Sequence, residues 1–262
     1  KQMVVEETNR MLQENQDNSI NLATWGNPTE RAQQGASTDE AYWLANDRQY
    51  NPYWGYQNGQ KRASRVVNNF EPSALLTWDF DINDRMKLTT SAFAKYAMYS
   101  ATRLNYNGQN PAPDYWKNFP SYNFDVWGNT DGNKSPDDLN AWTESRDFWM
   151  ASDRNRQINF DKLYYTNQHL NTVGRDAVYW IEAKHNDHLA TNLGSTFDWN
   201  VSKASKFQLG LQLASNKGMH YSTMEDLLGG KAFHNVNTYA QPGSELYASV
   251  APDLSAELNG ED

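Results

Sequence analysis

The chain has 262 residues, a formal net charge of −9 and no cysteine. The missing cysteine excludes a disulfide scaffold and a cysteine-ligated zinc site. The excess of acidic residues argues against nucleic acid as a partner, because phosphate must be neutralised by basic side chains. The longest apolar run is 177–181, far short of the roughly 20 residues of a transmembrane helix. Aromatic residues make up 13% of the chain, which disfavours generic disorder.

The two ends of the chain carry no recognisable targeting signal. Residues 1–17 suit one or two turns of helix, and neither they nor residues 240–262 can be assigned to a larger element. The first residues lack the apolar core of a signal peptide, and the last carry no retention or lipidation motif. Either the protein is cytoplasmic, or the chain is an interior piece of a longer envelope protein, which the absence of cysteine would suit.

From Asn18 onward the apolar residues follow a period of two, which predicts β-strands. After a first strand around Ile20 and Leu22, the clearest alternation runs over 66–80 and resumes over 85–100, on either side of the polar turn DIND at 81–84. Such a polar four-residue segment is typical of a tight turn. We therefore expect a hairpin at about 65–100 with strands of more than ten residues.

A second hairpin is expected at about 188–216, around the turn SKAS at 202–205. It aligns with the first without a gap at an offset of 119. Asp79 then matches Asp198, and Lys87 matches Lys206. In each copy an aromatic pair stands where the strand reaches the turn, Trp78 with Phe80 and Phe197 with Trp199. The chain therefore repeats one design.

Two long segments separate the predicted strands, at about 27–61 and 101–187. Loops beyond about 15 residues are uncommon in compact domains and are usually functional. Both long segments fall at one end of the strands, and both short turns fall at the other.

This asymmetry favours an all-β fold, an antiparallel transmembrane β-barrel segment with long extracellular loops. In a lipid bilayer every backbone polar group must be paired, which a closed barrel achieves. Trp78, Phe80, Phe197 and Trp199 would then lie at the membrane interface, where aromatic rings concentrate. A soluble β-sandwich or barrel with one buried face also alternates, and it remains the alternative.

Three words of the sequence resemble the TonB-dependent outer-membrane receptors of Bacteroidetes. The first is NPTERAQQGA at 27–36 with NPYWGYQNGQKR at 51–62; the second is PDYWKNFPSY at 113–122; the third is MEDLLGG at 224–230. They occur in the order found in that family, and the resemblance covers about 18–239.

The resemblance implies a location in the outer membrane of a Gram-negative bacterium, with the loops extracellular. It implies a barrel of about 22 strands that imports a nutrient such as a glycan, a peptide or a metal complex. The implied partners are outer-membrane lipid, TonB acting through parts not present in this chain, and a surface lipoprotein. About five strands are recognisable here, and no plug or TonB box, so we expect an interior portion of such a receptor.

Two groups of residues could hold a metal ion. His185 and His188 flank Asp187, but at a junction of strand and loop they share no face, so we expect an exposed loop.

The run DGNKSPDD places Asp131, Asn133 and Asp137 at alternating positions, which hints at Ca²⁺. An EF-hand loop would need Gly and Glu where this sequence has Pro136 and Trp142. A solvated acidic turn is therefore favoured, and no cofactor is predicted.

Catalytic chemistry has little support in the sequence. Asp114, Asp125, Glu144 and Asp147 could supply a carboxylate pair for glycoside hydrolysis, but nothing fixes their separation. No nucleophile elbow, phosphate-binding loop or zinc-protease motif occurs. We predict no enzymatic activity.

Aromatic residues of the second long segment are the better candidates for contact with a substrate or partner. The alternative is that they pack the loop against itself. The candidates are Tyr115, Trp116, Phe119, Tyr122, Trp127, Trp142 and Trp149.

The sequence thus favours one function over two others. The leading hypothesis is nutrient transport by an outer-membrane receptor. The second is a soluble secreted carbohydrate-binding β-domain, and the third is an enzyme on a β scaffold.

Overall fold

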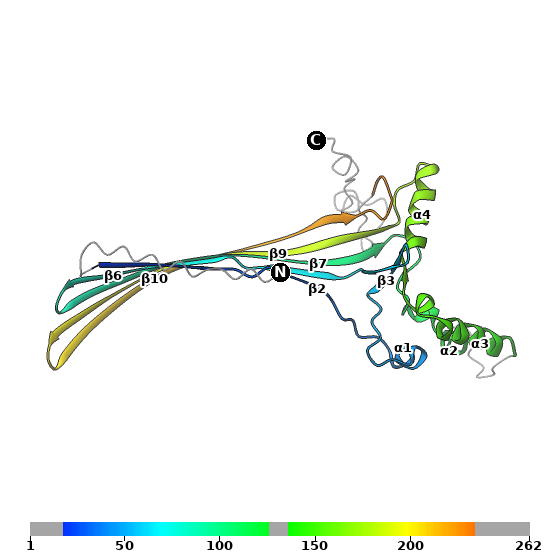
Figure 1. Ribbon diagram of the computed structural model, residues 1–262, viewed down its shortest axis with the longest axis horizontal. Helices are drawn as coiled ribbons and strands as arrows, with labels where there is room; N and C mark the ends of the chain where they lie inside the picture. The colour runs from blue at the N-terminus through cyan, green and yellow to red at the C-terminus, as the bar shows by residue number, and fades with distance from the viewer. Residues whose placement is uncertain (1–17, 126–135, 234–262) are drawn as a thin grey trace, which may run out of the picture. The chain divides into compact units, whose positions relative to one another are not determined.

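The structure is a computed structural model that describes residues 18–125 and 136–233 (Figure 1). These residues fold mostly as antiparallel β-sheet, as the alternation predicts. No helix in the described ranges is long and apolar enough to cross a membrane. The chain divides into two compact units. The described part of the sheet unit is 18–31, 67–101 and 184–222, and that of the loop unit is 32–66, 102–125, 136–183 and 223–233.

Seven strands build one large sheet. They are β1 (Asn18–Trp25), β2 (Thr29–Ala32), β5 (Val66–Phe70), β6 (Ser73–Asn83), β7 (Met86–Tyr106), β9 (Tyr179–Ser202) and β10 (Ser205–Asp226). β1 pairs with β6 and β2 with β5, so these four segments form two interrupted rows beside β7, β9 and β10. Pro28 and Pro72 stand at the interruptions, where a residue without an N–H is tolerated. The described strands form an open sheet.

The register gives the sheet unit two chemically different faces. Leu22, Leu76 and Ala92 stand directly across from one another on β1, β6 and β7. The next residues along, Asn21 and Thr77, oppose each other on the other face, and Ser91 continues their row. Side chains of directly opposed residues share a face, and successive side chains alternate. One face is therefore apolar and the other polar.

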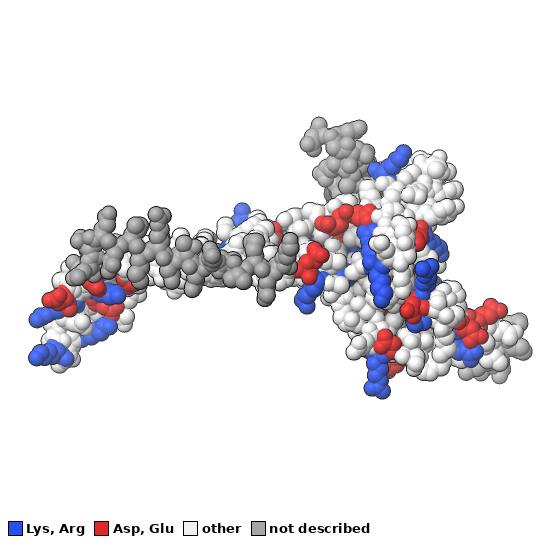
Figure 2. Space-filling model, in the orientation of Figure 1, with Lys and Arg blue, Asp and Glu red and all other residues white. Residues whose placement is uncertain are grey.

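The two hairpins carry the same ion pair beside their short turns. Lys87 lies 3.1 Å from Asp79, and Lys206 lies 2.7 Å from Asp198. These are the positions that the internal repeat matches. Figure 2 shows basic and acidic side chains together at this end of the sheet. The repeat in the sequence thus corresponds to a repeat in side-chain contacts.

The loop unit contains helices and a small sheet of its own. Its elements are α1 (Asp39–Ala45), β3 (Trp54–Gln57), β4 (Gln60–Ala63), η1 (Trp116–Asn118), α2 (Tyr122–Asp125), α3 (Pro136–Ala151), η2 (Asp153–Arg156), β8 (Ile158–Asn159) and α4 (Phe160–Thr172). β3 pairs antiparallel with β4 and parallel with β8. Gly55 makes the second pairing possible, because a Cβ there would lie 1.9 Å from the carbonyl oxygen of Ile158.

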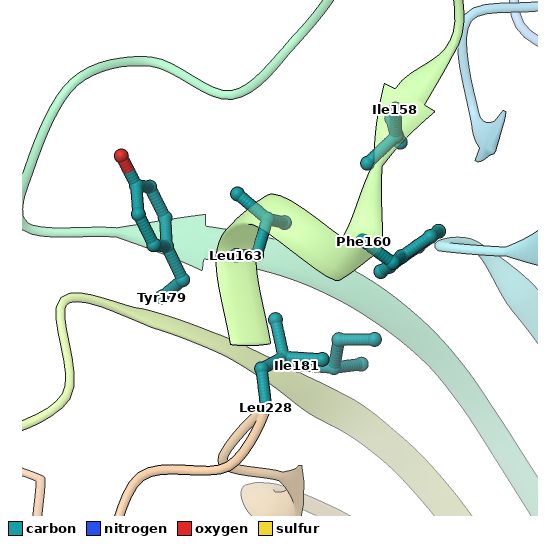
Figure 3. Packing of buried hydrophobic residues seen from close by; sticks show 6 residues of the cluster. All are labelled: Ile158, Phe160, Leu163, Tyr179, Ile181 and Leu228. Atoms are coloured by element: carbon teal, nitrogen blue, oxygen red, sulfur yellow. The ribbon is translucent and has the colours of Figure 1, made fainter. Parts of the chain in front are cut away.

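One hydrophobic cluster of the loop unit joins α4 to the start of β9 and the end of β10. It consists of Ile158, Phe160, Leu163, Tyr179, Ile181 and Leu228 (Figure 3). Beside it Asn167 is fully buried and serves five backbone groups. Its Nδ2 donates to the carbonyls of Tyr179, Leu227 and Leu228, and its Oδ1 accepts from two N–H groups of 178–179. A polar core residue of this kind holds three chain segments together.

The segments expected to be long irregular loops differ from that expectation. Segment 27–61 contains α1 and β3, and segment 101–187 contains α3 and α4. The helical period of α4 was hidden because its buried face includes the polar Asn167. The strands are also longer than the hairpins expected at 65–100 and 188–216, since β7 ends at Tyr106 and β9 begins at Tyr179.

The residues around Asp187 lie in β9 rather than in an exposed loop. Asp187 is buried, and its carboxylate accepts hydrogen bonds from the Tyr99 N–H at 3.2 Å and the Tyr221 hydroxyl at 2.9 Å. His185 stacks on the Tyr221 ring. The exposed-loop prediction failed here because the strand continues past the apolar alternation that marked it.

Candidate ligand-binding cleft

A cleft of about 740 Å³ lies within the loop unit. Its walls come from 109–113, from η1 and the start of α2, from one side of α3, and from the segments around η2 and α4. Volumes of roughly 300–1,000 Å³ are usual for small-molecule sites. The cleft is therefore large enough to hold a ligand.

Local hydrogen bonds shape the wall that contains the second family-like word. The Asn110 side chain accepts from the Ala112 N–H at 3.0 Å, and Nδ2 of Asn118 donates to the Ala112 carbonyl, also at 3.0 Å. The Asn118 carbonyl in turn accepts from Nε1 of Trp149 at 3.0 Å. These bonds tie the turn before η1 to α3 and fix the wall in place.

Two of the predicted contact residues form the core behind the cleft. Phe119 and Trp149 are 3% and 2% exposed, and their ring centroids are 5.1 Å apart. Tyr50 packs on Trp149, and its hydroxyl donates to the Arg156 carbonyl. Burial raises the pKa of Tyr50 well above its usual range. Because Phe119 and Trp149 are both buried, their main contribution is to order the loop.

The other predicted aromatic residues are more accessible. Trp116 is 48% exposed and meets Tyr122, which lines the cleft, edge-on at a centroid distance of 5.1 Å. Tyr115 also contacts Trp116, with the ring centroids 5.9 Å apart. Trp142 is half-buried under the guanidinium of Arg146. The structure thus brings Tyr115, Trp116 and Tyr122 together beside the cleft.

Of the charged residues of the cleft, Glu144 was among the carboxylates proposed from the sequence, whereas the two lysines were not singled out. Lys117, Lys162 and Glu144 line it. Lys117 belongs to the word PDYWKNFPSY, so the resemblance could have drawn attention to it. Lys162 lies on α4, a helix that the sequence pattern did not indicate. Of the other proposed carboxylates, Asp114 accepts from the Ser37 hydroxyl and Asp147 pairs with Arg146, so both already have partners.

The family-like words, and segment 37–50 between the two parts of the first word, contact one another in the fold. Besides the bond from Ser37 to Asp114, the Glu40 carboxylate accepts from both the N–H and the hydroxyl of Ser121. Arg62, in the first word, lies 2.5 Å from Asp226, in the third. These contacts link segments 77 to 164 residues apart. The words therefore contribute to architecture.

The pair formed by Arg62 and Asp226 is reinforced by Tyr164, whose hydroxyl donates to Asp226 at 2.9 Å. Burial opposes the ionisation of Asp226, but hydrogen bonds, led by the one from Arg62, outweigh it and hold its pKa below the ordinary value. Burial also opposes the charge on Arg62, and Asp226 outweighs it and raises the Arg62 pKa. The pair is therefore ionised near neutral pH.

The remaining predicted residues lie elsewhere. Trp78, Phe80, Phe197 and Trp199 are on strands of the sheet unit, and Trp78 stacks on Phe80. Trp127, Asp131 and Asn133 and the side chain of Asp137 fall outside the described residues. In the described ranges no group of three or more His, Asp or Glu side chains is placed to hold a metal ion.

The run proposed for Ca²⁺ leads directly into α3, which begins at Pro136. Proline at the first helical position followed by acidic residues is typical of a helix start.

Comparisons with protein-family models, with curated proteins and with solved structures found no match for this chain.

Proposed function

We propose that the chain is a portion of the wall and the extracellular loops of a TonB-dependent outer-membrane receptor that imports a nutrient. The observation that carries this proposal is the exposed apolar face of the sheet unit. Leu76 on β6 is 42% exposed, Leu193 on β9 is 47% exposed and Leu211 on β10 is 68% exposed. Monomeric soluble proteins rarely expose apolar patches beyond a few hundred Å². Lipid is a solvent that suits such a face.

The apolar residues occur on strand after strand. They are Ile20, Leu22, Leu76, Trp78, Ile82, Leu189, Leu193, Trp199, Val201, Phe207, Leu209, Leu211 and Leu213, all at least 37% exposed. On the opposite face the rows are polar, as in Asn21, Thr77 and Ser91. A barrel wall needs this combination, because its outer face meets hydrocarbon and its inner face meets water.

The height of the apolar face also supports the proposal. Phe80 stands across from Leu88, and eight residues further along β7 comes Tyr96, which is exposed. At about 3.4 Å per residue this is about 27 Å along the strand, or about 20 Å across a membrane at a tilt near 40°. Outer-membrane barrels have an apolar band about 25 Å tall, with aromatic residues at both borders. Phe80 and Tyr96 fit those borders.

The three family-like words support the choice of a TonB-dependent receptor among barrels. In this proposal TonB supplies the energy for import by acting on parts of the receptor outside this chain. The loop unit faces the outside of the cell, where its cleft is open to a nutrient. A surface lipoprotein is the proposed partner there.

Fractionation tests the proposal. The whole protein, expressed in a Gram-negative host, should sediment with outer-membrane markers and should be released only by detergent. Growth on its nutrient should require TonB. Recovery of the folded protein in the soluble fraction without detergent would contradict the proposal.

A further inference from the structure

The cleft of the loop unit carries more positive than negative charge, although the chain as a whole has a net charge of −9. Lys117 and Lys162 line it, and neither forms an ion pair with a described residue. The Lys117 Nζ lies over the Trp116 ring, 5.4 Å from its centroid, which is a cation–π contact. Glu144 is the one acid among the described lining residues. A ligand that enters therefore meets two available ammonium groups.

The rest of the lining suits a hydroxyl-rich molecule. Seven of the described lining residues are Asn or Gln. Several use one end of the amide within the fold, as Asn110 and Asn118 do, which leaves the donor or acceptor at the other end for a hydroxyl group. Tyr122 and Phe148 add rings, and Phe148 is 57% exposed. The apolar faces of such rings stack on the C–H faces of sugars. Trp116 extends this aromatic surface beyond the cleft through its contact with Tyr122.

We infer that the cleft binds an anionic carbohydrate, a sugar chain that bears carboxylate or sulfate groups. Lys117 and Lys162 pair with its charges, and the amides and rings hold its hydroxyl groups and C–H faces. The rings and amides together favour a sugar over an acidic peptide. The inference rests on the proposed function, because it names the class of cargo that the receptor takes up.

Calorimetry on the whole protein purified in detergent tests the inference. The ligand is a short oligogalacturonide, and the matched control ligand is its methyl ester, which has the same sugars without the charge. The charged form should bind, and the ester should bind at least roughly tenfold more weakly, because a hydrogen bond to a charged group is stronger than one to a neutral group. Added salt should weaken the binding of the charged ligand and leave the binding of the ester unchanged.

Variants identify the site. Lys117→Gln with Lys162→Gln should reduce affinity for the oligogalacturonide to that for the ester. Lys203→Gln, a lysine in the turn between β9 and β10, should leave it unchanged. Glu144→Gln should bind at least as tightly as the wild type, which also shows that a substituted cleft still folds.

Further ligands separate the sources of charge. If an oligosaccharide whose only charges are sulfate groups displaces the oligogalacturonide from the cleft, the charge of the natural ligand is assigned to sulfate. An oligoglutamate that binds more tightly than either sugar would overturn the inference. Equal affinity for the acid and its ester would overturn it too, as would full affinity in the double lysine variant. These outcomes do not depend on fractionation or TonB dependence, so each proposal can fail separately.

Discussion

A positive charge placed on the apolar face should destabilise the protein in a membrane far more than the same charge on the neighbouring residue. Leu76 and Thr77 are adjacent on β6 and lie on opposite faces. Leu76 stands across from Ala92, midway between Leu88 and Tyr96 on β7. If these residues mark the borders of the apolar band, Leu76 lies at the middle of the bilayer.

The expected magnitude follows from that depth. An arginine on the lipid face costs about 2–4 kcal/mol at the midplane and about 0–1 kcal/mol near the interface. Leu76→Arg should therefore lower the free energy of unfolding by about 2–4 kcal/mol. Ile82→Arg, at the turn, should cost about 1 kcal/mol or less, and Thr77→Arg on the wet face should stay within about 0.5 kcal/mol.

Urea titration of the protein in lipid vesicles measures these differences, with heat-modifiable gel mobility as the measure of the folded fraction. If the face met water instead of lipid, Leu76→Arg would cost no more than about 0.5 kcal/mol. That result, or an equal cost for Leu76→Arg and Thr77→Arg, would refute the lipid-facing assignment.

Three further predictions concern the loop unit, and thermal melting checks each of them. Asn167→Ala leaves several buried backbone groups without partners and should lower the free energy of unfolding by at least about 3 kcal/mol. The control Gln168→Ala, on the exposed side of α4, should change it by no more than about 0.5 kcal/mol. Similar losses for the two variants would contradict the role of Asn167. Gly55→Ala forces a Cβ against β8 and should abolish that pairing, whereas Gly210→Ala, with no atom within 4 Å of the new Cβ, should be tolerated. The folded pKa of Asp226 is depressed, so its contribution to stability is present above the unfolded value of 3.8 and is lost as the pH falls through the folded value. Asp226→Asn should be less stable at neutral pH and should lose less stability than the wild type on acidification below about pH 4, and parallel curves would contradict the ion pair.

Much of the sheet could be predicted because strand periodicity is a local signal. The alternation around Leu76 and Thr77 indicated which residues share a face. The offset of 119 paired Asp79 with Asp198 and Lys87 with Lys206, and each acid lies beside the lysine of its own hairpin. Both features depend only on neighbours along one strand or across one short turn.

The cleft could be predicted only in part. The aromatic residues of 115–122 stood out by composition, and Tyr122 does line it. Composition could not separate the buried Phe119 from the exposed Trp116, because burial depends on what packs against each ring. Lys162 gave no signal, since nothing in the sequence indicates that α4 and η1, which contains Lys117, line the same cleft.

The sequence by itself determined the antiparallel strands, their two faces and the short turns, because alternation and turn residues act over a few positions. It also contained the family-like words on which the transport proposal partly depends. The tertiary structure alone decided that Arg62 meets Asp226, that Asn167 joins three segments and that Lys117 and Lys162 share a cleft. Those contacts form between residues far apart in the chain, and only the packing of the whole loop unit brings them together.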